Sequence, residues 1–189
     1  PQIGTFLHYL LENVTRDVLA QGGFAAVDND RLHGLVRQYI DQYAAQELHN
    51  FQNRNARFQY LFRRLRNTAY AVIDQVAEEL RHSDFIPMAF ELSFGGKNGT
   101  LPAVTISQPD GELRVGGKVD RVDGWIRDDK LYLRVVDYKS GKKKFDLANV
   151  RMGLDIQMLL YLFALQKEGK RYFGREIEPA GVLYLPARD

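Results

Sequence analysis

Residues 117–139 read GKVDRVDGWIRDDKLYLRVVDYK, and this stretch decides the fold. Its apolar alternation predicts two strands, over 117–126 and 131–139, joined by a polar turn at 127–130. Residues that face each other across an antiparallel hairpin have a constant index sum, and a turn centred between Asp128 and Asp129 sets that sum at 257. Asp120 and Asp137 share it. An even-length turn therefore places these two carboxylates side by side, roughly 5 Å apart, whereas a three-residue turn with a bulge would break the register.

Two facing carboxylates destabilise a strand pair unless a cation lies between them or one of them is protonated. A divalent metal is the simplest solution, because Mg²⁺ takes carboxylate, water and phosphate oxygens as ligands. Lys139 lies two residues after Asp137 and shares its strand face, where an ammonium would polarise a water or stabilise charge on a phosphate. Taken alone, Asp-x-Lys is more often an exposed ion pair.

Other polar residues extend this picture. Arg121 and Asp123 fall on the opposite face of the first strand and are expected to form structural charge contacts. Gln157 and Tyr161 are spaced i, i+4 and project from one helix face, either as site residues or as a polar notch in a buried helix. His8 lies beside the apolar stripe of the first helix, where a histidine is most often an ordinary surface residue. The basic candidates for nucleic-acid contact are Lys142, Lys143, Lys144, Arg63, Arg64 and Arg66.

The rest of the chain surrounds the hairpin with helices and further strands. Apolar periodicity predicts helices over 3–19, 30–51, 58–81 and 148–167. Strands are expected over 88–94, near 104–106 and over 181–185. The core order is then α, β, β, β, α, β. We expect one domain, with the first helix over 1–20, a helical lobe over 21–84 and a mixed-sheet core over 85–189.

Composition narrows the possible classes of protein. The chain has 189 residues, 45% of them hydrophobic, and a net charge of only +2, so any nucleic-acid footprint depends on clustered charge. The absence of cysteine excludes disulfides, thiolate zinc sites and an iron–sulfur cluster held by these residues. No apolar window is long enough to span a membrane. Because it begins at Pro1, we expect a piece of a longer protein.

Five motifs follow one another along the chain: Gly4-x-x-x-His8, Phe90-Glu91-Leu92-Ser93-Phe94-Gly95, Gly117-Lys118-Val119-Asp120-Arg121-Val122-Asp123, Val136-Asp137-Tyr138-Lys139-Ser140-Gly141 and Gln157-x-x-x-Tyr161. In this order they resemble the RecB-like branch of the PD-(D/E)XK nucleases, with the closest likeness to the carboxy-terminal nuclease domain of AddB subunits of AddAB-type helicase–nucleases. The resemblance spans nearly the whole chain and implies an α/β fold of the restriction-endonuclease type with an inserted helical lobe.

The resemblance also implies roles for individual residues. The implied metal ligands are Asp120, Asp137, His8 and the backbone carbonyl of Tyr138, with Glu91 as a less certain acidic contributor. Lys139 would activate the attacking water or steady the phosphate, and Gln157 and Tyr161 would orient the active site and the scissile phosphate.

The activity implied is Mg²⁺-dependent hydrolysis of DNA phosphodiesters, with Mn²⁺ as a substitute, by an exodeoxyribonuclease acting in double-strand-break repair and recombination. The implied partners are DNA and an AddA-like helicase–nuclease subunit in the bacterial cytoplasm, with no membrane. AddB-like proteins often carry an iron–sulfur cluster, whose cysteines would have to lie outside these residues. Two alternatives stay open: a non-catalytic DNA-binding or subunit-docking module on the same fold, and a stand-alone RecB-like or CRISPR-associated exonuclease.

Overall fold

The computed structural model describes residues 2–48, 56–97, 99–139 and 155–187. They divide into two compact units. The helical unit holds the residues up to Ser83 together with Lys139 and residues 186–187, and the sheet unit holds residues 84–138 and 155–185.

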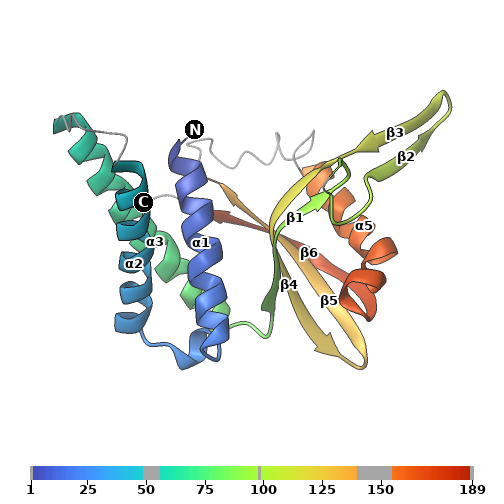
Figure 1. The fold of residues 1–189 in the computed structure, drawn as a ribbon. Helices are drawn as coiled ribbons and strands as arrows, with labels where there is room; N and C mark the ends of the chain where they lie inside the picture. The colour runs from blue at the N-terminus through green and yellow to red at the C-terminus, as the bar shows by residue number, and fades with distance from the viewer. Residues whose placement is uncertain (1, 49–55, 98, 140–154, 188–189) are drawn as a thin grey trace. The chain divides into compact units, whose positions relative to one another are not determined.

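Helices make up most of the described part of the helical unit (Figure 1). They are α1 (Gln2–Ala20), the short 3₁₀ helix η1 (Phe24–Ala26), α2 (Asn29–Leu48) and α3 (Ala56–Arg81). The three predicted helices are confirmed, although the predicted end of the second, near residue 51, lies outside the described residues. The apolar stripe of α1 is buried as its periodicity predicts, from Phe6 to Val18. The helix ends before Gly22, whose φ of 103° favours glycine.

Polar side chains tie the helices of this unit together. Tyr39 on α2 donates a hydrogen bond to Asp17 on α1 over 2.5 Å, and this bond raises the pKa of the Tyr39 hydroxyl to about 12. Arg81, in the last turn of α3, donates to the backbone carbonyls of Phe24 and Val27 over 3.1 Å and 2.8 Å. The loop between α1 and α2 is thereby fixed to the end of α3.

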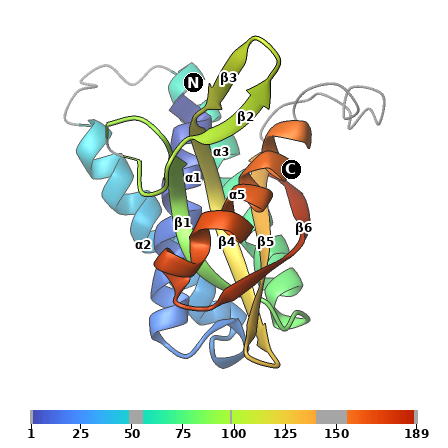
Figure 2. The same cartoon turned by 90° about the vertical axis from the view of Figure 1, so that its right-hand side faces the viewer.

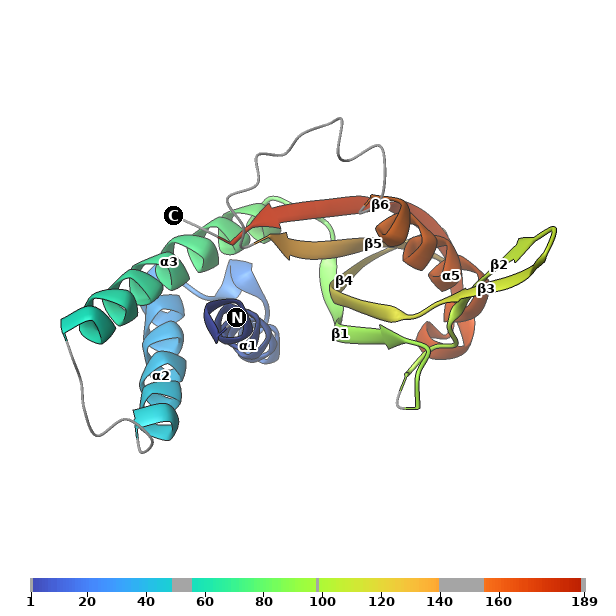
Figure 3. The ribbon, with the colours of Figure 1, turned by 90° about the horizontal axis from the view of Figure 1, so that it is seen from above.

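A four-stranded sheet in the order β1-β4-β5-β6 forms the centre of the sheet unit. Its strands are β1 (Ile86–Phe94), β4 (Gly117–Arg127), β5 (Lys130–Lys139) and β6 (Glu176–Pro186). The pairs β1/β4 and β4/β5 are antiparallel, whereas β6 returns parallel to β5 after helix α5 (Asp155–Phe173) (Figure 3). The mixed sheet and the order α, β, β, β, α, β confirm the predicted α/β fold class.

Helix α5 covers one face of this sheet (Figure 2). Its apolar residues Met158, Tyr161, Leu162 and Leu165 belong to the same buried core as residues of β1, β4 and β5. The predicted start of this helix, at 148–154, lies outside the described residues. No described helix, α5 included, is long and apolar enough to cross a membrane.

A second, two-stranded sheet consists of β2 (Val104–Gln108) and β3 (Gly111–Val115). It extends away from the four-stranded sheet as a hairpin (Figure 1). The sequence predicted only one strand here, because the Glu-Leu-Arg segment of β3 is exposed and shows no apolar alternation. This hairpin adds nothing to the core order.

The Gly117→Ala variant is expected to destabilise the protein, because an added Cβ would lie 1.8 Å from the hydroxyl oxygen of Tyr161. Tyr161 is fully buried, and its hydroxyl donates to the carbonyl of Gly116 over 3.0 Å, so the ring cannot move aside without losing contacts. We expect the free energy of unfolding in urea to fall by about 1–3 kcal/mol.

Gly34→Ala in α2 is the matched control. An added Cβ at Gly34 meets no atom within 4 Å, and this glycine lies inside a helix, so alanine should raise the free energy of unfolding by up to about 1 kcal/mol. Equal stability of the two variants would contradict the packing of Tyr161 against Gly117.

Candidate active site

The register of the β4/β5 hairpin is the one predicted from its turn. Pairing runs from Arg127 with Lys130 to Arg121 with Val136, and every pair has the index sum of 257. Asp128 and Asp129 form the two-residue turn, with left-handed φ values of 52° and 63°. A turn of this kind matches the twist of the two strands, so the even-length turn is confirmed and no bulge intervenes.

Asp120 lies where the β4/β5 ladder ends. The backbone amide of Tyr138, on β5, donates to the carboxylate of Asp120 over 2.8 Å. Asp120 is only 8% exposed, so this charge-assisted bond holds a largely buried carboxylate in one orientation. Asp137 also has a buried carboxylate oxygen. Its expected position beside Asp120 stays a prediction, because the strand pairing stops one residue earlier.

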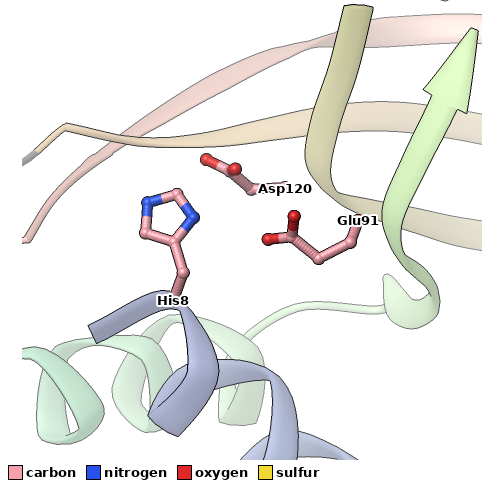
Figure 4. Close-up of side chains that lie close together, drawn as sticks. All are labelled: His8, Glu91 and Asp120. Carbon is pink, nitrogen blue, oxygen red and sulfur yellow. The ribbon is translucent and has the colours of Figure 1, made fainter. Parts of the chain in front are cut away.

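Strand β1 pairs with β4 on the side away from β5, and its residue Glu91 lies opposite Asp120. The pairs Phe90 with Arg121 and Leu92 with Val119 flank these two acids. A carboxylate oxygen of Glu91 and one of Asp120 lie within 4.8 Å of each other, and Figure 4 shows the two groups projecting into the same space. Glu91, which the family resemblance implied only as a less certain metal ligand, is therefore a direct neighbour of Asp120.

The backbone of β1 is unusual at this position. Glu91 has a φ of 50°, a left-handed value that is rare for a residue with a side chain, above all inside a strand. Ala89 and Leu92 are three residues apart, and both belong to the buried core, although regular alternation would place them on opposite faces. The turn of the backbone at Glu91 shifts the alternation and directs the carboxylate toward Asp120.

Lys118 adds a positive charge beside this pair of acids. Its ammonium forms an ion pair with Glu91 across the β1/β4 ladder, and its side chain is 54% exposed. Lys118 and Asp120 are two residues apart on β4, so the two side chains extend from neighbouring positions of one strand.

Two of the predicted site residues, Lys139 and His8, belong to the helical unit. Lys139 is the last residue of β5 and lies two positions after Asp137, so both share a strand face as predicted. Its backbone carbonyl accepts a hydrogen bond from the amide of Ala187 over 2.8 Å, which fixes the end of the strand. His8 is half-buried on α1, in the turn that also carries the buried Leu7 and Leu11.

Gln157 and Tyr161 of α5 hold the start of β4. Gln157 donates to the Tyr161 hydroxyl over 2.7 Å, and that hydroxyl donates to the carbonyl of Gly116. The Tyr161 ring stacks on Phe94 with 4.6 Å between centroids. The pair therefore fixes the backbone at Gly116, a few residues before Asp120. The orienting role of Gln157 and Tyr161 stays a prediction.

The predicted nucleic-acid contacts are described only in part. Arg63, Arg64 and Arg66 are exposed on α3. Lys142, Lys143 and Lys144 lie outside the described residues.

A buried charge cluster lies on the sheet face opposite α5. Arg121 and Asp123 are both fully buried and form two hydrogen bonds, of 2.7 Å and 2.9 Å, while Arg134 donates to the same carboxylate over 2.8 Å. The predicted structural role of Arg121 and Asp123 is confirmed. Arg121 also donates to the Tyr138 hydroxyl over 2.7 Å. Burial raises the pKa of Tyr138 to about 12, so this hydroxyl stays protonated at neutral pH.

The helix, antiparallel hairpin, crossover helix and parallel strand, with acids on the central strand, define a nuclease-type α/β fold. A family profile described as the PD-(D/E)XK nuclease superfamily matches residues 1–189. The chain belongs to this superfamily.

Bacterial relatives match the chain along its full length. A protein of Acetivibrio thermocellus is 35% identical, one of Symbiobacterium thermophilum 33% and one of Clostridium tetani 31%, each over the whole of this chain. All three are named as a subunit of an ATP-dependent helicase/deoxyribonuclease. The chain spans only 16–17% of the length of these relatives.

The left-handed backbone at Glu91 predicts an inverted preference between glycine and alanine. Both Glu91→Gly and Glu91→Ala remove the carboxylate, but only glycine adopts this φ without steric cost. The glycine variant should therefore be more stable in urea by about 1 kcal/mol.

Glu178 on β6 provides the control, because it also forms an ion pair with a lysine, Lys130, over 3.1 Å, and its backbone is not left-handed. There alanine should be more stable than glycine by about 0.5–1 kcal/mol. The same order of stability at both positions would contradict the strained backbone at Glu91.

Proposed function

We propose that this chain is a metal-dependent deoxyribonuclease module that hydrolyses DNA phosphodiester bonds. The observation that carries the proposal is the pair formed by Asp120 and Glu91, whose carboxylate oxygens lie within 4.8 Å of each other on adjacent strands of a nuclease fold. Two acids this close favour a bound cation, because each disfavours the ionised form of the other.

The donor set suits a hard divalent cation. Carboxylate oxygens are the ligands that Mg²⁺ prefers, and it keeps further positions for waters and phosphate oxygens. Nucleases of this superfamily depend on divalent metal ions. We therefore propose Mg²⁺ as the metal, with Mn²⁺ as a substitute. Its ligands would come from Asp120 and Glu91, together with Asp137 and the backbone carbonyl of Tyr138. The family resemblance implies His8 as a further ligand.

The metal would supply Lewis-acid stabilisation of charge on the scissile phosphate. The ammonium of Lys139, on the same strand face as Asp137, would donate hydrogen bonds to the attacking water or to a phosphate oxygen. In the hydrolysis a water oxygen forms a bond to phosphorus, the bond to the leaving sugar oxygen breaks, and that oxygen takes up a proton. Gln157 and Tyr161 would keep β4, and hence Asp120, in place.

The relatives suggest the wider context. Their name includes a helicase and a deoxyribonuclease, so we propose that the chain is the nuclease module of an AddAB-type complex that pairs with an AddA-like subunit. It would act as an exonuclease in break repair and recombination in the bacterial cytoplasm. The exposed arginines of α3 and the lysines at 142–144 are proposed contacts for the DNA backbone.

Variants of the site should separate chemistry from folding. Asp120→Asn, Asp137→Asn and Lys139→Met should each lower Mg²⁺-dependent cleavage of linear DNA by about 10²-fold or more. The two asparagine variants weaken a proposed metal ligand, and the methionine variant removes the ammonium that would stabilise charge on the phosphate. Cleavage is measured with end-labelled duplex and single-stranded DNA, and folding by circular dichroism.

Asp129→Asn is the matched control, since it makes the same charge change at the other end of the same hairpin. Asp129 is fully exposed, and asparagine tolerates its left-handed φ. It should cleave like the wild type. Undiminished cleavage by the Asp120 and Asp137 variants would overturn the proposed site, and wild-type protein that binds DNA without cutting it would favour the non-catalytic alternative.

Lys118 should compete with the metal for Glu91. The Lys118→Met variant should bind Mn²⁺ about two- to fivefold more tightly in isothermal titration without DNA, because the ion pair that occupies the carboxylate is gone. In a Glu91→Gln background the same substitution should have no effect.

The control for general electrostatics is Lys130→Met, which breaks the ion pair with Glu178 at the turn end of the hairpin. This variant should bind Mn²⁺ like the wild type. Equal gains in affinity for both lysine variants would mean that Lys118 acts only through net charge.

A further inference from the structure

We infer that Tyr138 is a positioning residue that holds Asp120 through its backbone amide and is itself held by the buried cluster of Arg121, Asp123 and Arg134. The inference rests on the proposed function, since it concerns how the site of that function is kept in shape.

The first link is the bond between the Tyr138 amide and the Asp120 carboxylate, 2.8 Å long. Along the rest of the hairpin the strands are joined by backbone bonds, and the pairing ends at Arg121 and Val136. Beyond this point a side chain of β4 takes the place of a backbone acceptor. The orientation of Asp120 therefore depends on where β5 carries the amide of Tyr138.

The second link fixes Tyr138 itself. This residue is 7% exposed, and its hydroxyl accepts a hydrogen bond from Arg121 over 2.7 Å. The guanidinium carbon of Arg121 also lies 5.7 Å from the centre of the Tyr138 ring, close enough for a cation–π contact. Rotation of the ring, or a shift of β5 at this position, would leave a buried guanidinium N–H without its partner.

The third link makes Arg121 rigid. Asp123 accepts hydrogen bonds from two nitrogens of Arg121 and one from Arg134, all over 2.7–2.9 Å, and both Arg121 and Asp123 are fully buried. Buried ion pairs add little net stability compared with apolar packing, and we infer that this one serves to specify geometry. Arg121 and Asp123 follow Asp120 closely on β4, so one strand carries both the acid and the cluster that sets its position.

The chain Asp123, Arg121, Tyr138, Asp120 thus connects a rigid charge cluster on one face of the sheet to an acid of the proposed metal site. Every link is a hydrogen bond of 2.7–2.9 Å within the sheet unit. The Asp-Arg-x-Asp and Asp-Tyr-Lys motifs therefore form one hydrogen-bond network, and the tyrosine hydroxyl connects the two motifs.

Tyr138→Phe tests this hydrogen-bond network, because it removes only the hydroxyl and keeps both the buried ring and the amide. We expect Mn²⁺ to bind about tenfold more weakly in isothermal titration, as is typical when a group that orients a metal ligand is lost. The exchange of the amide hydrogen at residue 138, followed by NMR in metal-free buffer, should be about tenfold faster, because the bond to Asp120 opens more often.

Tyr132→Phe is the matched control. Tyr132 lies on the same strand and the same face, packs on Trp125 with 5.5 Å between ring centres, and pairs at the turn end of the hairpin. It should keep wild-type Mn²⁺ affinity and wild-type exchange at residue 138. Urea unfolding of both variants shows whether a change in affinity merely follows a change in global stability.

The outcomes separate this inference from the proposed function. If the wild type binds Mn²⁺ and the Tyr138→Phe variant matches it in both affinity and exchange at residue 138, the positioning role is wrong and the metal site stands. If the wild type binds no Mn²⁺ and cleaves no DNA, the proposed function is wrong, whereas faster exchange at residue 138 in the variant would still support the link to Asp120.

Discussion

The two strand registers of β4 determine the position of the paired acids in the sheet unit. On one side, the two-residue turn at Asp128 and Asp129 fixes the pairing with β5, so that the ladder ends next to Asp120. On the other side, the pairing with β1 places Glu91 opposite Asp120. A shift of one residue in either register would turn these side chains to the wrong face. The site therefore depends first on how β4 is held between its neighbours.

The two faces of the sheet serve this requirement by different means. On the face covered by α5, apolar packing holds the strands, and Tyr161 presses against the glycines at the start of β4. On the other face, the bonds between Arg121 and Asp123 fix the same strand through polar contacts. Apolar packing tolerates small adjustments, whereas a buried, hydrogen-bonded guanidinium does not. The combination gives a stable sheet with little freedom at Asp120.

The sequence predicted the hairpin well and the rest of the site less well, for physical reasons. A two-residue turn leaves only one register, so the index sum of 257 could be worked out from Asp128 and Asp129 alone. The connection from β1 to β4 contains a whole hairpin, β2/β3, and no such rule applies across it. The left-handed backbone of Glu91 has no signal in the sequence, because glutamate rarely adopts such a φ and nothing in the neighbouring residues indicates it. The roles of Arg134 and the Tyr138 hydroxyl were missed because they depend on contacts across strands.

The most direct test of the account is anomalous diffraction from crystals of the protein soaked in Mn²⁺. We predict a peak within about 2.2 Å of carboxylate oxygens of both Asp120 and Glu91, and no peak there in the Asp120→Asn variant. A saturated wild-type crystal without a peak at Asp120, or one with the same peak in the variant, would contradict the proposed metal site.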